Sequence, residues 1–383
     1  MHYDKQMLAD YNKGRVIELI SNNGPINRAE IAKQLDLSIP TIMKIVDEFI
    51  HEGIVRTVGR GKSTGGKRPE LYEIIKDAYY CIGVDLGRFR LKTIVADLQG
   101  EIIVKKVNDI SQISDSHQII EIIEKNIQEI IDNNAFPQEK IMGIGLGVPG
   151  IIERETGKIL YSPDFGWENV DFSTYLKEKF NLWVAIENSN RTEALGEKWL
   201  GVAQPANNIF SVNIGHGIGG AILKGDEIYR GSSGASGEFG HIVLEKDGPL
   251  CDCGNHGCLE ALASGNAIAK KMKKKEAKEV FDLAREGNRE AIEIIDEAVE
   301  YLGIGIAGAI NVLDPDMVIL SGGVTQSYDL FGDRLQQVVK KRQMKYREGK
   351  VNIKVGTLGD DATAIGAVVL LLKNFKNHGG QIV

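Results

Sequence analysis

The segment from Gly237 to Glu260 contains three of the chain's four cysteines. These are Cys251, Cys253 and Cys258, and His241 precedes them. Three thiolates and one imidazole form the tetrahedral ligand set of a closed, structural Zn²⁺ site. A disulfide or an incidental cluster of cysteines is the alternative, but no secretory signal accompanies these residues. The spacing therefore predicts a zinc-bound loop, around which the rest of the fold must be arranged.

Glycines and carboxylates surround the predicted ligands. Gly254 and Gly257 allow the backbone to turn tightly enough for the cysteines to reach one ion. Carboxylates are poor additional ligands beside soft thiolates. We therefore expect Glu238 and Glu260 to point elsewhere and to remain available for another ligand.

Composition narrows the class of protein. The 383 residues are 43% apolar, which suffices for two or three domains. No apolar N-terminal signal or membrane-length apolar stretch is found, so we expect a cytoplasmic protein. The net charge of −7 argues against a general polyanion-binding surface. Between Arg56 and Arg68, however, five basic residues and no acidic one stand among glycines, which predicts a mobile cationic loop.

Three short helices are predicted before this loop. Residues 13–22 have helical apolar spacing, Asn27 and Glu30 form a capping box for a second helix, and Ser38 can cap a third. In the third helix the apolar positions i, i+3, i+4, i+7 and i+8 predict a core stripe: Ile42, Ile45, Val46, Phe49 and Ile50. The tight turn between the last two helices is typical of a helix-turn-helix, and strands near 53–56 and 71–75 would add a wing.

The last helix of such a unit enters the major groove of DNA. The candidates for groove contact are Thr41, Met43 and Lys44. The candidates for phosphate contact are Ser38 and the basic residues of the wing: Arg60, Lys62, Lys67 and Arg68. A small helical cap that contacts only its own protein is the alternative. In that case the cations of the wing would repel one another with no phosphates to neutralise them.

After a hinge at residues 76–80, the chain repeats one plan. A strand at 82–86 ends in a glycine turn and a second strand follows, and residues 209–223 repeat this order. The repeat predicts an α/β fold of two similar lobes with a cleft between them. Glycine turns at the ends of strands let backbone amides approach a ligand. We expect a DNA-binding domain at 1–76, a first lobe at 77–195 and a second lobe at 196–383, with the C-terminal helix returning to the first lobe.

These motifs resemble the ROK family (repressors, open reading frames and kinases), in particular its xylose-repressor type of transcriptional regulator. Gly240-His241 followed by Cys251-x-Cys253-Gly254-x-x-Gly257-Cys258-x-Glu260 resembles the zinc signature of the family. The stretch from Ser63 to Pro69 resembles the wing motif of its regulators. The resemblance implies an actin-like, ribonuclease-H-like pair of lobes after a winged helix-turn-helix.

The family's kinases bind a sugar beside ATP between their lobes. By resemblance, five residues stand where those enzymes contact sugar hydroxyls: Gly150, Asn188, Glu238, His241 and Glu260. His241 could hold zinc with one ring nitrogen and the sugar with the other. Zinc would then fix the orientation of the imidazole.

Two departures from the family's kinases argue against catalysis. Those kinases carry an aspartate as general base where this chain has Ser189, whose hydroxyl is far too weakly basic. Arg88 and Phe89 replace the small residues of the first phosphate loop. Phosphoryl transfer is therefore expected to be lost, and the glycine turns at 215–220 and 321–323 are expected to persist as tight turns of the fold.

The sequence thus favours a sugar-responsive repressor that is not an enzyme and that binds a palindromic operator as a homodimer or homotetramer. Three alternatives remain: a sugar kinase with an attached DNA-binding domain, a DNA-binding protein that responds to a protein partner, and an activator. Xylose, glucose and N-acetylated sugars all remain open as the effector.

Overall fold

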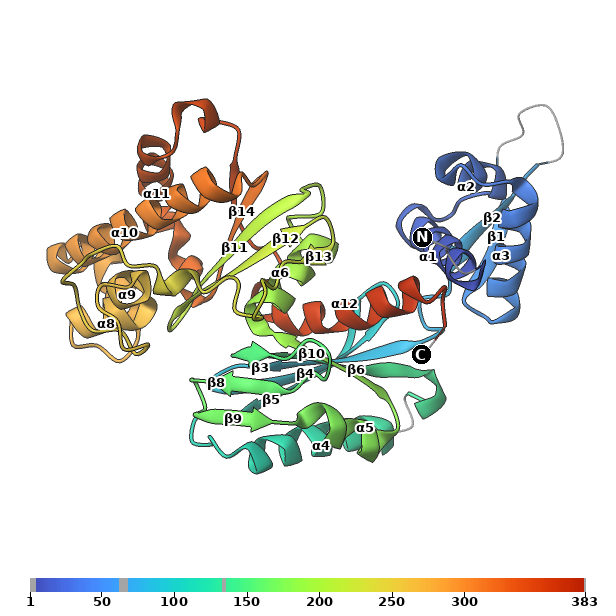
Figure 1. Ribbon diagram of the computed structural model, residues 1–383, viewed down its shortest axis with the longest axis horizontal. Coiled ribbons are helices and arrows are strands. Elements are labelled where there is room, and N and C mark those ends of the chain that lie inside the picture. The colour runs from blue at the N-terminus through green and yellow to red at the C-terminus, as the bar shows by residue number, and fades with distance from the viewer. Residues whose placement is uncertain (1–4, 62–67, 133–135, 382–383) are drawn as a thin grey trace. The chain divides into compact units, whose positions relative to one another are not determined.

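The computed structural model describes residues 5–61, 68–132 and 136–381 (Figure 1). The chain divides into two compact units. Unit 1 comprises the chain up to Gly150, Glu155–Glu187 and the residues from Ala367 onward. Unit 2 comprises Ile151–Arg154 and Asn188–Gly366. None of the helices that the structure describes is both long and apolar enough to cross a bilayer.

Unit 1 begins with a winged helix-turn-helix. It consists of α1 (Lys5–Asn23), α2 (Arg28–Leu35), α3 (Ile39–His51), β1 (Val55–Arg60) and β2 (Glu70–Ile74). The Asn27 side chain accepts a hydrogen bond from the Glu30 amide at 3.0 Å, and the reciprocal bond completes the predicted capping box. Ser38 caps α3 by accepting from the Thr41 amide at 3.2 Å. The helices and the antiparallel β1–β2 pair confirm the prediction for this region.

The core stripe of α3 is confirmed with one exception. Ile42, Ile45, Val46 and Phe49 are at most 6% exposed. Ile50 is 37% exposed, so its assignment to the core was wrong. Eight residues of α-helix rotate its side chain by about 80° from that of Ile42, which carries it off the buried face.

The rest of unit 1 is built on a five-stranded sheet with the order β10-β6-β3-β4-β5. Its strands are β3 (Tyr80–Leu86), β4 (Arg90–Asp97), β5 (Ile102–Asp109), β6 (Ile141–Val148) and β10 (Trp183–Asn188). The remaining elements of this region are η1 (Gln138–Lys140), α4 (Ser116–Asp132), α5 (Phe172–Phe180) and the strands β7 (Ile151–Ile152), β8 (Ile159–Ser162) and β9 (Trp167–Val170). Strand β3 pairs antiparallel with β4 and parallel with β6.

Unit 2 contains a second five-stranded sheet with the order β13-β12-β11-β14-β15. Taken from β15 to β13, this order corresponds to β10-β6-β3-β4-β5 of unit 1. Its strands are β11 (Asn208–Ile214), β12 (Ile218–Lys224), β13 (Glu227–Ile228), β14 (Met317–Ser321) and β15 (Asn352–Val355). Strand β11 pairs antiparallel with β12 and parallel with β14, as β3 pairs with β4 and β6. The same order and directions in both sheets confirm the internal duplication predicted from the sequence.

Helices cover the sheet of unit 2 and supply most of its core. They are α6 (Ser189–Leu200), α7 (Leu259–Ala263), α8 (Gly265–Lys271), α9 (Ala277–Arg285), α10 (Arg289–Leu313) and α11 (Tyr328–Arg342), with the short turns η2 (Phe239–His241), η3 (Gly323–Ser327), η4 (Lys345–Arg347) and η5 (Gly359–Asp361). One side of α10 lies in a hydrophobic core that also contains residues of β11 and β14, and Leu302, Ile306 and Ile310 are at most 1% exposed.

The C-terminal helix α12 (Ala362–Asn377) begins in unit 2 and continues into unit 1. Within unit 1 its end lies against α1, since a methyl group placed on Gly14 would lie 2.2 Å from the Lys376 carbonyl oxygen. A methyl group on Gly380 would lie 2.9 Å from the Phe49 ring of α3. The last turn of the chain therefore completes the core of the winged helix-turn-helix. The domain boundaries proposed after residues 76 and 195 remain predictions.

Candidate functional site

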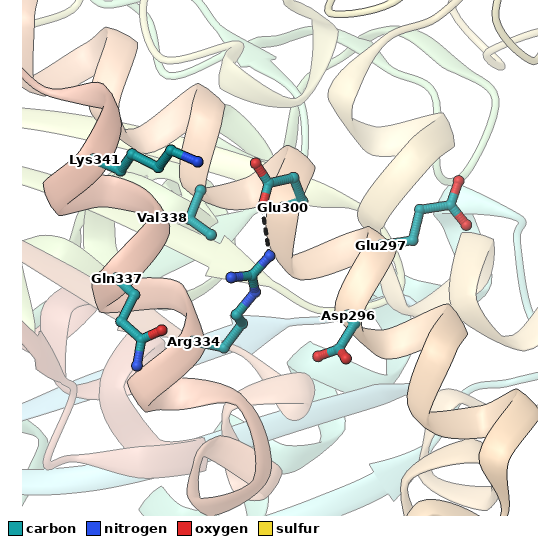
Figure 2. A pocket seen from close by; sticks show the side chains of 7 residues that line it. All are labelled: Asp296, Glu297, Glu300, Arg334, Gln337, Val338 and Lys341. Carbon is teal, nitrogen blue, oxygen red and sulfur yellow. Dashed lines mark hydrogen bonds and ion pairs between the residues drawn. The ribbon is translucent and has the colours of Figure 1, made fainter.

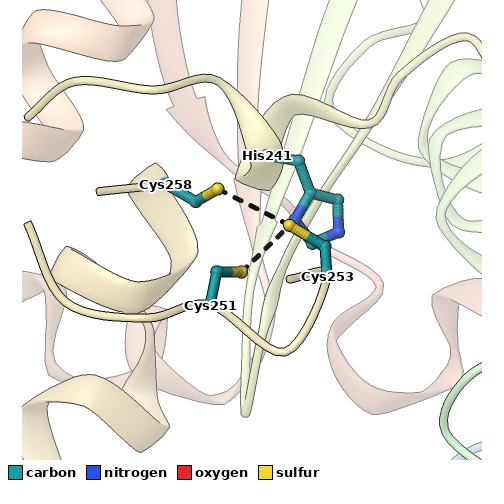
Figure 3. A group of neighbouring side chains, drawn as sticks. All are labelled: His241, Cys251, Cys253 and Cys258. Carbon is teal, nitrogen blue, oxygen red and sulfur yellow. Dashed lines mark hydrogen bonds between the residues drawn. The ribbon is translucent and has the colours of Figure 1, made fainter. Parts of the chain in front are cut away.

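The predicted metal ligands of unit 2 lie together. One donor atom from each of His241, Cys251, Cys253 and Cys258 lies within 4.8 Å of the others (Figure 3). The Cys253 and Cys258 sulfur atoms are 3.7 Å apart, and the Cys251 sulfur is 3.6 Å from His241 Nδ1. A tetrahedron with Zn–S bonds of about 2.3 Å has edges of about 3.8 Å. The four side chains could therefore hold a metal ion with little rearrangement.

Local backbone structure fixes this arrangement. His241 ends η2 and Cys258 precedes the first turn of α7. Isolated bridges pair Val243 with Cys258 and Leu250 with His256. A methyl group on Gly257, whose φ is +68°, would lie 1.6 Å from a backbone carbonyl oxygen, so only glycine fits there. Burial raises the pKa of the Cys258 thiol to about 12, so a bound cation would be needed to stabilise its thiolate.

Three of the predicted sugar contacts gather beside this cluster in unit 2. Glu238 Oε2 lies 3.8 Å from Nε2 of His241, while Nδ1 of the same ring faces Cys251. Glu260 Oε2 accepts a hydrogen bond from the Ile218 amide at 2.8 Å. Desolvation raises the pKa of the Glu238 carboxyl, although the nearby His241 lowers it. One ring nitrogen of His241 thus faces the cysteines and the other faces the Glu238 carboxylate.

The two other predicted sugar contacts have backbone roles. Asn188 caps α6, its Oδ1 accepting from the Asn190 amide at 3.0 Å and from the Arg191 amide at 3.3 Å. Gly150 belongs to unit 1 and has a φ of +126°. A methyl group on it would lie 2.3 Å from the Tyr161 carbonyl oxygen. Neither observation tests a role in sugar binding, so both assignments remain predictions.

Arg191 is a residue to which the sequence reasoning gave no role. It is 3% exposed and donates to the carbonyl oxygens of Gly234 at 2.6 Å and Ser236 at 2.8 Å. These bonds tie the start of α6 to the loop that leads to Glu238, and the guanidinium also lowers the pKa of that carboxyl. An arginine at the start of a helix gives no sign that the helix end will be buried.

Glu193 of α6 was also missed. It is 6% exposed and accepts a hydrogen bond from Asn213 Nδ2 at 2.6 Å. Burial raises the pKa of its carboxyl, although hydrogen bonds from Ser321 and Asn213 lower it. Asn213 lies near the end of β11 and Ser321 is the last residue of β14, so this carboxyl lies close to the ends of the two strands that precede the glycine turns.

The residues that replace the kinase phosphate loop are bulky in the structure as well. Arg88 and Phe89 form the turn between β3 and β4, and the Arg88 guanidinium lies 5.6 Å from the Phe89 ring centroid. Arg88 Nη1 also lies 3.5 Å from Asp164 Oδ1. Ser189, in place of the catalytic aspartate, is the first residue of α6.

The predicted DNA contacts lie on α3 and the wing. Met43 and Lys44 are exposed on α3, and Arg60 and Arg68 are exposed at the ends of the wing strands. Ser38 and Thr41 share a hydroxyl–hydroxyl hydrogen bond of 2.7 Å at the helix start. Lys62 and Lys67, with most of the wing motif from Ser63 onward, lie outside the described residues.

One argument about the wing needs correction. Arg56 is one of the five basic residues between Arg56 and Arg68, all of which were expected to repel one another without phosphates to neutralise them. In the structure it donates to Glu73 Oε1 from Nε at 2.9 Å and from Nη2 at 2.7 Å. Arg56 and Glu73 are opposite one another in the β1–β2 register, which explains the pair.

Comparison with known families agrees with this architecture. A model described as "Winged helix-turn-helix DNA-binding" matches residues 10–56, and a model described as "ROK family" matches residues 81–374. The chain belongs to the ROK family. The fold class and the family predicted from the sequence are thereby confirmed.

Individual relatives cover different shares of the chain. The xylose repressor of Caldicellulosiruptor bescii is 33% identical, over 96% of this chain and 97% of its own. The glucokinase of Thermotoga maritima is 32% identical, over 76% of this chain and 96% of its own. The crystal structure of a ROK family transcriptional regulator, a homolog of the E. coli MLC protein, superposes with a TM-score of 0.86 at 25% identity and covers 98% of both chains.

Proposed function

We propose that this protein is a sugar-responsive transcriptional repressor of carbohydrate-utilisation genes. The observation that carries the proposal is similarity to a xylose repressor over 96% of this chain, together with the winged helix-turn-helix model that matches residues 10–56. The exposed outer face of α3 supports a role in DNA binding. A repressor that acts on DNA works in the cytoplasm, where we place this chain.

The DNA contacts divide into two classes. Thr41, Met43 and Lys44 on α3 contact base edges in the major groove. The phosphate contacts are made by Ser38, Arg60, Lys62, Lys67 and Arg68. One helix-turn-helix reads one half-site, so two copies of the chain bind a palindromic operator.

The effector is a monosaccharide held by Gly150, Asn188, Glu238, His241 and Glu260. Carboxylate and amide groups are suited to neutral hydroxyls, which both donate and accept hydrogen bonds. Zn²⁺ binds the three cysteines and His241 Nδ1 and fixes the ring, which leaves Nε2 to face Glu238 and the sugar. The metal is structural, because four protein ligands leave no open position.

Phosphoryl transfer is not part of this function. Ser189 lacks the basicity to take a proton from a sugar hydroxyl near neutral pH. Arg88 and Phe89 fill the turn in which a kinase brings backbone amides to phosphate. The sugar instead shifts an equilibrium between two states, and by linkage operator DNA weakens sugar binding to the same degree.

Calorimetry of the zinc-loaded full-length protein tests the effector site. The panel is xylose, glucose, N-acetylglucosamine and their 6-phosphates where these exist, each with and without ATP. We expect saturable binding of one sugar with no ATP turnover. Binding of none of them would contradict the sensor assignment, and hydrolysis of ATP in the presence of a sugar would favour a kinase.

A further inference from the structure

The start of α3 exposes apolar side chains. Ile39, the first residue of the helix, is 53% exposed, and Met43, one turn later, is 44% exposed. Pro40 is exposed beside them. In a helix-turn-helix, the residues at the start of the second helix are the ones that contact base edges in the major groove. Ile39, to which the sequence reasoning gave no role, therefore lies where DNA sequence is read.

Polar side chains on the same part of α3 already have partners within the domain. The Ser38 and Thr41 hydroxyls share a hydrogen bond of 2.7 Å, so only one of their two hydroxyl hydrogens remains free to donate. Asp47 forms an ion pair with Arg28 of α2, whose guanidinium lies 4.9 Å from the centroid of the Tyr72 ring. Arg28 therefore competes with the amino group of any cytosine for the Asp47 carboxylate.

Apolar side chains suit one feature of the major groove, the C5 methyl group of thymine. The other base edges present hydrogen-bond donors and acceptors, with which isoleucine cannot pair and methionine pairs only weakly. Ile39 and Met43 are four residues apart, which corresponds to about 6 Å along the helix axis and about 40° around it. Successive base pairs are about 3.4 Å apart. A helix that lies along the groove would therefore bring the two side chains to base pairs one or two steps apart.

A charged surface elsewhere in the chain is neutralised from within. In the groove between α10 and α11, Glu300 accepts hydrogen bonds from Arg334 and Arg342 at 3.0 Å each, and Glu297 forms an ion pair with Lys271 at 2.8 Å (Figure 2). These pairs neutralise both glutamates, so the groove gives no sign of an external ligand. The apolar side chains at the start of α3, by contrast, remain open to a partner.

We propose that Ile39 and Met43 read the C5 methyl groups of two thymines, one or two base steps apart, in each half-site of the operator. The inference rests on the proposed function and names the feature of DNA that its helix-turn-helix recognises. A cytosine at either position would offer no methyl group. Its amino group would also lose water against an apolar surface without gaining a hydrogen bond, so G·C pairs are disfavoured there.

Replacement of thymine by uracil tests this proposal, because uracil lacks only the C5 methyl group. The operator is selected from random palindromes with the full-length protein. Each thymine in turn is then replaced in both half-sites, and affinity is measured by fluorescence anisotropy. At the two contacted positions we expect affinity to fall by about fourfold per methyl group, or about 15-fold for both half-sites. Wild-type affinity at every uracil position would overturn the proposal.

Substitutions in α3 assign each methyl group to a side chain. Ile39→Ala should lose the sensitivity to uracil at one position and Met43→Ala at the other, while each variant keeps the remaining sensitivity. Ile50→Ala is the matched control and should keep both, because Ile50 is 37% exposed on the same helix but lies about 16 Å from Ile39 along the axis. Unchanged sensitivity to uracil in both Ile39→Ala and Met43→Ala would mean that other residues read the methyl groups, and would overturn the assignment.

Operators that contain 5-methylcytosine provide a second test with the protein unaltered. At each contacted position the T·A pair is replaced by a C·G pair, with or without the C5 methyl group on cytosine. These two operators have the same donors and acceptors, so their comparison isolates the methyl group. The methylated operator should bind about fourfold more tightly per methyl group, and equal affinities would contradict the proposal. Failure of the selection to yield any operator would contradict the proposed function, and the inference with it.

Discussion

Replacement of Arg191 by methionine should separate effector binding from DNA binding. The guanidinium donates hydrogen bonds to the carbonyl oxygens of Gly234 and Ser236, and these two bonds hold the loop that leads to Glu238. Methionine keeps much of the side-chain volume but has no donor. Both half-buried carbonyl groups would then lose a charged partner, while Glu238 would lose a nearby positive charge.

The magnitude follows from these two bonds. Hydrogen bonds to charged groups contribute about 1.5–3 kcal/mol each, and removal of the buried cation recovers part of its own desolvation cost. A net loss of about 2–4 kcal/mol is expected. For a unit of this size this corresponds to a fall in melting temperature of roughly 4–16 °C. If half of this free energy is lost from sugar binding through displacement of Glu238, sugar affinity falls by about 5- to 30-fold.

The assay is calorimetric titration with the effector sugar beside operator binding by fluorescence anisotropy. Arg289→Met is the control, because the Arg289 side chain is 92% exposed and forms an i,i+4 pair with Glu293 on its own helix. We expect weaker sugar binding and unchanged operator affinity for Arg191→Met alone. Wild-type sugar affinity in a variant that has lost the expected stability would refute the idea that Arg191 positions the sugar-binding loop.

Three further substitutions test other parts of the account. Gly257→Ala forces a methyl group against a backbone oxygen at a positive φ, so we expect loss of bound zinc by elemental analysis and about 2–4 kcal/mol of stability, whereas Gly254→Ala, with open space around it, should cost only about 1 kcal/mol. The folded state raises the pKa of Glu193, so it holds a proton more tightly than the unfolded chain, and stability falls as pH rises from the ordinary carboxyl value toward the raised one. Glu193→Gln should remove this fall in melting temperatures measured between pH 4 and 8, and an unchanged pH profile would contradict it. Gly14→Val drives α1 away from Lys376, so operator affinity should fall with sugar binding intact, and equal operator affinity would show that this contact is dispensable.

Local features of the sequence were predictable. The helix caps at Asn27 and Ser38 depend only on residues up to three positions away, and the structure contains both caps. The metal ligands from Cys251 to Cys258 are close in sequence, so short glycine turns bring them together without help from the rest of the fold. The internal duplication was also predictable, because the two halves of the chain repeat one pattern of strands and glycine turns.

Features that depend on distant residues were not predictable. The Arg56–Glu73 pair exists only because a long connection folds back to align two strands. Arg191 acquires its role from carbonyl groups more than forty residues away, which no local pattern marks. The packing of Gly380 against Phe49 joins the C-terminal segment to α3, and no local sequence pattern indicates that these two residues are in contact.

The most direct test of the account is release of operator DNA by sugar, compared between the wild type and Glu238→Ala. The operator is selected from random palindromes with the full-length protein, and its dissociation is followed by anisotropy as the effector sugar is added. We predict that both proteins bind the operator equally, that sugar releases the wild type, and that Glu238→Ala stays bound at every sugar concentration. Release of the variant at the same sugar concentration as the wild type would contradict the assignment of the effector site.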